Sequence, residues 1–185
     1  MIKTFLDRLN NWPSPKKTRI LLIFGIIFFI IIIPFMILFY ELSGYPVSFI
    51  ESQLSFSGTI IKSHFSAMNA VELNYYLIWV IIDYGFMLGF TLIYFNLGLT
   101  LARKFEETSG WRKSGYIGAL FGLLYFLCDA VENMFIFLML TDISGFPNVL
   151  AVIHSWFAVL KFIFNFSSGY WLIHVSVVLS IRRKP

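Results

Sequence analysis

The sequence predicts an all-α fold, a polytopic membrane protein whose four transmembrane helices form a bundle, with an amphipathic outer loop between helices 1 and 2. Two observations predict this fold class. Of the 185 residues, 58% are hydrophobic and 13% are charged, whereas soluble domains are about half apolar and about a quarter charged. The apolar residues also form four long runs, and each exceeds the ~20 residues that a helix needs to cross a bilayer.

The predicted elements form a single membrane domain over residues 1–185. In the outer loop, Ile50, Leu54, Ile61, Phe65 and Met68 recur every three or four residues, with a break at Ser57–Gly58. This rhythm predicts one or two amphipathic helices on the outer surface, which either cover a cavity or only shorten the exposed connection. The predicted elements are the cytoplasmic basic segment 1–19, the four spans 20–40, 73–101, 114–140 and 149–181, and the outer loop 41–72.

The distribution of Lys and Arg predicts the orientation. With four spans, 12 of the 14 basic residues fall on one side of the membrane, and that side is expected to be cytoplasmic. Both termini are therefore predicted to be cytoplasmic. Because topology accounts for the basic residues, we expect no nucleic-acid partner. The 12 are Lys3, Arg8, Lys16, Lys17, Arg19, Arg103, Lys104, Arg112, Lys113, Arg182, Arg183 and Lys184.

Four ionisable residues remain inside the predicted spans, namely Asp83, Asp129, Glu132 and Lys161. Counted from the outer ends of their spans, at about 1.5 Å per residue, all four fall within ~6 Å of one depth. Three helices therefore bring charge to a single layer. Helical spacing extends this layer, because residues three, four or seven apart share a face. The neighbours on these faces are Tyr125 and Asn133 on span three, His154 and Asn165 on span four, and Trp79 on span two.

A charge at the centre of a transmembrane helix costs ~2.5–3.5 kcal/mol on insertion scales. The layer is therefore either a functional site or a buried polar network that fixes the register of the helices. Three acids and one lysine would leave two uncompensated negative charges, so we expect at least one carboxyl to be protonated at neutral pH. We predict no cofactor and no metal, because Lys161 would repel a cation and no ligand-spacing motif is present.

Two families share parts of this pattern. With Asp83 in the stretch "LIWVIIDYGFMLGF", the layout resembles the EXPERA group of four-span proteins, which includes sterol isomerases and the sigma-2 receptor. That resemblance implies acids around a ligand cavity, although span one of this chain carries no acid. With "DAVEN" at 129–133 and Lys161, the chain also resembles small bacterial four-span membrane proteins of unknown function. That second resemblance implies no activity.

The leading hypothesis is binding of a lipid or another amphiphile, with the acids holding its head group. A lipid-modifying enzyme is the first alternative, in which Asp129, Glu132 and Lys161 supply acid–base chemistry. Proton-coupled transport would require a homo-oligomer, and a purely structural or interaction role is the fourth possibility. The residues expected to bind the ligand are Asp83, Tyr125, Asn133, His154, Asn165 and Trp79.

Overall fold

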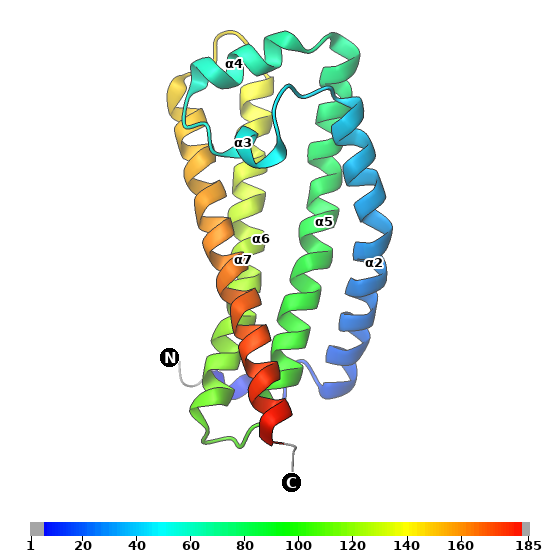
Figure 1. The fold of residues 1–185 in the computed structure, drawn as a ribbon, viewed down its shortest axis with the longest axis vertical. Helices are drawn as coiled ribbons and strands as arrows, with labels where there is room; N and C mark the ends of the chain where they lie inside the picture. Colours follow the sequence, from blue (N-terminus) through cyan, green and yellow to red (C-terminus); the bar gives the residue numbers. More distant parts are fainter. Residues whose placement is uncertain (1–5, 183–185) are drawn as a thin grey trace. The chain divides into compact units, whose positions relative to one another are not determined.

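The computed structural model describes residues 6–182, and all of their regular secondary structure is helical (Figure 1). Within these residues, four helices are long and apolar enough to cross a membrane, which confirms the predicted all-α, four-helix class. The predicted basic residues Lys3, Arg183 and Lys184 lie outside the described residues. The helices are α2 (Pro15–Leu42), α3 (Phe49–Gln53), α4 (Gly58–Ala67), α5 (Ala70–Ala102), α6 (Gly110–Leu140) and α7 (Asn148–Arg182).

All four long helices begin before the predicted spans, and in three of them polar side chains accept hydrogen bonds from the first backbone N–H groups. The Ser14 hydroxyl accepts a hydrogen bond from the first turn of α2 at 3.4 Å, and the Ser109 hydroxyl does so for α6 at 3.2 Å. At α5, Asn69 Oδ1 accepts from the N–H of Glu72, and Glu72 Oε2 accepts from the N–H of Asn69. This reciprocal pair is a capping box, which fixes the start of α5.

The chain divides into two compact units, and each of the four long helices contributes to both. Unit 1 comprises Met1–Phe28, Leu88–Tyr125 and Ile163–Pro185. Unit 2 comprises Phe29–Met87 and Phe126–Phe162, and it therefore contains α3 and α4.

The core of unit 2 is aromatic and receives the apolar face of α4. Ile61, Phe65 and Met68 are buried against Tyr76 and Trp79, as their spacing predicts. The first turn of α4 is held to α7, because Asn148 Oδ1 accepts a hydrogen bond from the N–H of Gly58 at 2.6 Å. The break that the sequence shows at Ser57–Gly58 is the junction between the two helices of the outer loop.

Helix α3 is turned the other way from its sequence pattern, which corrects the prediction for Ile50 and Leu54. Ile50 is 59% exposed and Leu54 36% exposed, whereas the polar Gln53 is 2% exposed. The physical reason is that ring packing places this five-residue helix. The ring of Phe49 lies 5.4 Å from that of Trp79, a contact that outweighs the preference of two aliphatic side chains for burial.

Unit 1 is held together by arginine. The guanidinium of Arg103, just after α5, donates to the carbonyl of Leu9 at 2.7 and 3.0 Å, to that of Pro13 at 2.8 Å, and to the hydroxyl of Thr18 at 3.1 Å. These bonds tie the segment before α2 to the end of α5, and Leu9 is buried there. Arg103 therefore has a structural role besides its predicted role in orientation.

Close helix packing in unit 1 depends on glycine. A Cβ added at Gly122 would lie 2.9 Å from Tyr94 Cβ, and one added at Gly118 would lie 2.9 Å from the ring of Trp171. The carbonyls of these two glycines accept hydrogen bonds from Thr91 and Ser168. Small residues thus let the helix backbones approach closely.

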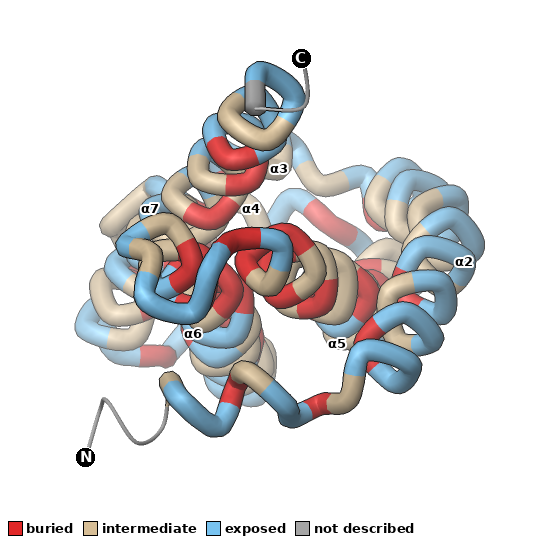
Figure 2. Tube along the Cα trace, turned by 90° about the horizontal axis from the view of Figure 1, so that it is seen from below, coloured by how far each residue is buried: buried red, intermediate tan, exposed pale blue. Residues whose placement is uncertain are grey.

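Helix α2 is the most exposed of the four long helices. In its most apolar 18-residue window 6% of the residues are buried, against 39% in α5 and in α6, and Figure 2 shows exposed residues along its length. Its outward side chains are almost all apolar, such as Ile23, Ile30 and Ile37. A sheath of this composition suits lipid rather than water, as expected for a peripheral transmembrane helix.

Candidate functional site

The predicted charge layer is a contact network within unit 2. Lys161 Nζ on α7 lies 2.8 Å from Asp129 Oδ1 and 2.7 Å from Glu132 Oε2, both on α6. All three side chains are 3% exposed or less. The three-residue spacing of the two acids on one helical face lets a single ammonium group bridge them.

Asp83 joins this network from α5. Its Oδ2 accepts a hydrogen bond from Asn133 Nδ2 at 2.8 Å, and the carboxylate interacts electrostatically with Asp129 and Lys161. The structure thus brings together all four predicted charges and Asn133. Three helices supply them, as counting residues along each span predicts.

His154 lies on α7 two helical turns before Lys161 and contacts the network at Glu132. Its Nε2 lies 3.5 Å from Glu132 Oε1, and both residues are buried. The ammonium group of Lys161 is the partner of Glu132 Oε2 at 2.7 Å. Among the described residues, Glu132 Oε1, Asn133 Oδ1 and His154 Nδ1 have no hydrogen-bond partner. Such buried groups without partners are costly, and they are the atoms at which the network could exchange a proton or accept another polar group.

The remaining predicted residues lie elsewhere. Tyr125 and Asn165 belong to unit 1, where the ring of Tyr125 lies 5.4 Å from that of Phe90. Trp79 belongs to unit 2 and lines a pocket. Within residues 6–182, no three His, Cys, Asp or Glu side chains are grouped so that they could hold a metal ion.

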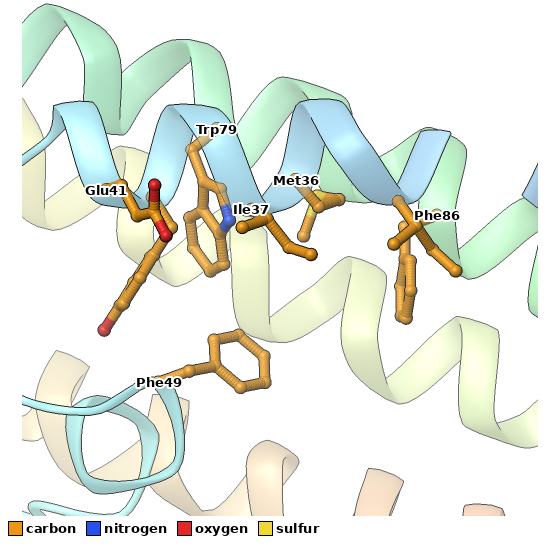
Figure 3. Close-up of a pocket in the computed structure, with 8 residues that line it drawn as sticks. Met36, Ile37, Glu41, Phe49, Trp79 and Phe86 are labelled. Atoms are coloured by element: carbon orange, nitrogen blue, oxygen red, sulfur yellow. The ribbon is translucent and has the colours of Figure 1, made fainter. Parts of the chain in front are cut away.

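The pocket lies in unit 2, beside the aromatic core, and has a volume of about 320 Å³. Figure 3 shows Glu41 and Trp79 at one end and Phe86 at the other, with Ile37 and Met36 between them and Phe49 on the opposite wall from α2. Helix α2 supplies most of the wall, α5 supplies Trp79 and Phe86, and α3 supplies Phe49. The full lining is Ile33, Met36, Ile37, Tyr40, Glu41, Phe49, Trp79 and Phe86.

Phe49 links the pocket to the charge layer. Its ring lines the pocket, and Lys161 Nζ lies 5.5 Å from its centroid, within the range of a cation–π contact. Beyond this contact, the ring packs against Trp79 on α5 at 5.4 Å. A residue of the outer loop therefore reaches the depth of the buried charges, although the sequence predicts that the loop lies on the surface.

Sequence reasoning missed most of the pocket. None of the residues predicted to bind a ligand lies in span one, yet α2 supplies five of the lining residues. The available signal is the pair Tyr40–Glu41, an aromatic residue followed by an acid at the end of a run otherwise free of both charge and tyrosine. Phe49 gives no such signal, because it is one of 22 phenylalanines.

Comparison with protein-family models, with curated proteins and with solved structures finds no match to this chain. The resemblance to the EXPERA group therefore stays a prediction. Any functional argument has to start from the pocket and the charge layer themselves.

Proposed function

We propose that this membrane protein binds a lipid or another amphiphile, with the apolar chain of the ligand in the pocket formed by α2, α3 and α5. The observation that carries the proposal is the pocket itself. Its volume of about 320 Å³ lies within the range of small-molecule sites, roughly 300–1,000 Å³. Its walls are aliphatic and aromatic except for Glu41 and the Tyr40 hydroxyl, which suits a chain with one polar end.

The wall of the pocket offers a route of entry from the bilayer. Ile37 lines the pocket and is 55% exposed, on the helix whose outward side chains suit lipid. An amphiphile dissolved in the membrane could therefore enter past α2 without crossing water. The charge layer, on the other side of Phe49, would then act on the polar end of the ligand through its field.

A photoactivatable probe tests the proposal. The full chain, purified in dodecyl maltoside, is irradiated with a hexadecyl tetraethylene glycol ether that carries a diazirine in its chain, and the labelled peptides are mapped by mass spectrometry. We expect labelling of residues 33–41 that saturates and is displaced by excess unlabelled ether. Labelling at the outer surface of the helices should not saturate.

Matched variants locate the binding site. Met36→Trp fills the pocket and should reduce the saturable labelling at least fivefold. Leu38→Trp adds the same volume to the same helix outside the lining and should leave the labelling unchanged. Ile37→Trp, at the exposed wall, repeats the test if Met36→Trp lowers the thermal stability. Labelling that does not saturate, or that survives both pocket variants, would overturn the proposal.

A further inference from the structure

We infer that the pocket selects amphiphiles with a positively charged ammonium head group, which an aromatic cage of Tyr40, Phe49 and Trp79 holds beside the carboxylate of Glu41. This inference rests on the proposed function and adds the chemical class of the ligand. It is carried by four side chains of the pocket lining, of which Figure 3 labels Phe49, Trp79 and Glu41.

The three rings are mutual neighbours. The ring centroids of Tyr40 and Trp79 are 5.1 Å apart, those of Phe49 and Trp79 5.4 Å, and those of Tyr40 and Phe49 6.2 Å. All three residues line the pocket. Faces of aromatic rings attract cations, and several rings around one point form the kind of cage that recognises quaternary ammonium groups.

The cage is built before a ligand arrives. The Tyr40 hydroxyl donates to the carbonyl of Val47 at 2.8 Å, which fixes that ring. The ring of Trp79 stacks on that of Tyr76 with centroids 5.5 Å apart, and Trp79 is 3% exposed. Rings fixed in this way lose little conformational entropy on binding, so more of the interaction energy appears as affinity.

The charges around the cage favour a cation. Glu41 lines the pocket next to Trp79 (Figure 3), is exposed, and forms no ion pair with any described residue. The lining contains no Lys, Arg or His that could bind an anion. Lys161 is near Phe49, but two carboxylate oxygens at 2.7 and 2.8 Å offset its charge. With Asp83 added, the network behind Phe49 holds three acids and one base.

Competition between three head groups tests the inference. Hexadecyltrimethylammonium, hexadecyl sulfate and unlabelled hexadecyl tetraethylene glycol ether each compete with the photoactivatable ether in dodecyl maltoside. We expect the trimethylammonium compound to compete at a concentration about tenfold lower than the neutral ether, the scale of a desolvated cation–π site. The sulfate should be the weakest competitor.

Variants distinguish recognition of the head group by the cage from binding of the ligand's apolar chain by the rest of the pocket. Glu41→Gln and Trp79→Leu should each reduce the preference for trimethylammonium over the ether at least threefold. Their matched controls, Glu51→Gln and Phe35→Leu, change an exposed acid and an exposed aromatic residue outside the lining and should keep the preference. Saturable binding without a head-group preference, or a preference that both cage variants retain, would overturn the inference and leave the proposed function standing. Absence of saturable binding by all three compounds would overturn both.

Discussion

Lys161 in unit 2 and Arg103 in unit 1 are cations with different kinds of partner. Lys161 pairs with two carboxylates, on residues 129 and 132. Arg103 instead donates to the backbone carbonyls of Leu9 and Pro13 and to one hydroxyl. The partners of the Lys161 ammonium group are carboxyl groups, which can gain or lose a proton. The partners of the Arg103 guanidinium are carbonyls and a threonine hydroxyl, whose protonation does not change.

This difference extends to the other polar groups of the two units. In unit 1, Thr91 and Ser168 also donate to backbone carbonyls, so each of these two hydroxyls has a hydrogen-bond partner. In unit 2, Glu132 and His154 keep buried atoms without hydrogen-bond partners among the described residues. Among the described residues, Asn96 Oδ1 in unit 1 also lacks a partner, whereas the other buried side-chain atoms of this kind all lie in unit 2. Buried polar groups are normally satisfied, so this concentration in unit 2 distinguishes the two units.

The largest effect is expected for Lys161→Met, which leaves Asp129 and Glu132 without their counter-charge. Removing one partner of a buried ion pair typically costs ~3–5 kcal/mol, because an unpaired charge stays behind. Unfolding of the purified chain in mixed dodecyl maltoside and dodecyl sulfate micelles should show a loss of this size.

A triple variant provides the control for Lys161→Met. Replacing Lys161, Asp129 and Glu132 together by Met, Leu and Met removes the lysine and both of its paired carboxylates. It should recover at least half of the loss, since apolar replacements of buried pairs are often neutral. A Lys161→Met variant as stable as the wild type would show that the lysine does not neutralise the acids.

The second largest loss of stability is expected for Arg103→Met. It leaves the carbonyl of Leu9 without its donors, whereas the carbonyl of Pro13 keeps the hydroxyl of Thr18 at 3.3 Å. A buried carbonyl that loses its hydrogen bonds costs ~1–3 kcal/mol. The same unfolding measurement should show a loss of about 2 kcal/mol, with faster hydrogen exchange over residues 9–18. Arg103→Lys should recover only part of the loss, because a lysine lacks the planar fork that reaches several acceptors.

No second substitution of a side chain can rescue Arg103→Met as the triple variant rescues Lys161→Met, because the partners of Arg103 belong mainly to the backbone. The binding of the photoactivatable ether should also stay within twofold of wild type. An Arg103→Met variant that folds with normal stability, or that loses ether binding, would remove the distinction between the two units.

The charge layer could be predicted from the sequence because the depth of a charged residue in a membrane span follows from the number of residues between it and the end of the span. A carboxylate such as Asp83 or Asp129 stands out among aliphatic residues, and the rise per residue then fixes its level. Phe49 and Arg103 could not be predicted in the same way. Their partners lie far along the chain, 94 residues away for Arg103 and Leu9, and neither residue departs from its local composition. Orientation, with both termini cytoplasmic, stays a prediction from the Lys and Arg distribution.

Asp83→Asn is expected to have a smaller effect. An amide at this position keeps an oxygen that accepts from Asn133 Nδ2, and it removes one negative charge from a network with three acids and one base. Stability should therefore change by less than ~1 kcal/mol, the range of substitutions that leave no group unpaired. A loss above ~2 kcal/mol in mixed micelles would mean that the Asp83 charge itself holds the three helices together.

The smallest expected effect concerns His64 on α4, which lies outside the long helices of unit 2. Its Nδ1 lies 3.4 Å from the Tyr45 hydroxyl, and burial lowers the pKa of His64 below its usual value of 6.5, although the nearby Glu51 opposes this shift. A base whose pKa is lower in the folded chain binds fewer protons there than in the unfolded chain. The contribution of His64 to the stability of the α4 region is therefore complete above pH 6.5 and declines as the pH falls through that value.

Hydrogen exchange over residues 58–67, corrected for intrinsic rates, measures this effect. Protection should decrease from pH 8 to pH 5 in the wild type and be nearly constant in His64→Gln. Parallel losses in both proteins would assign the pH response to other groups of unit 2. A loss confined to the wild type would show that the α4 region responds to pH through one histidine, whereas unit 1 is held by the guanidinium of Arg103, which stays protonated over this range.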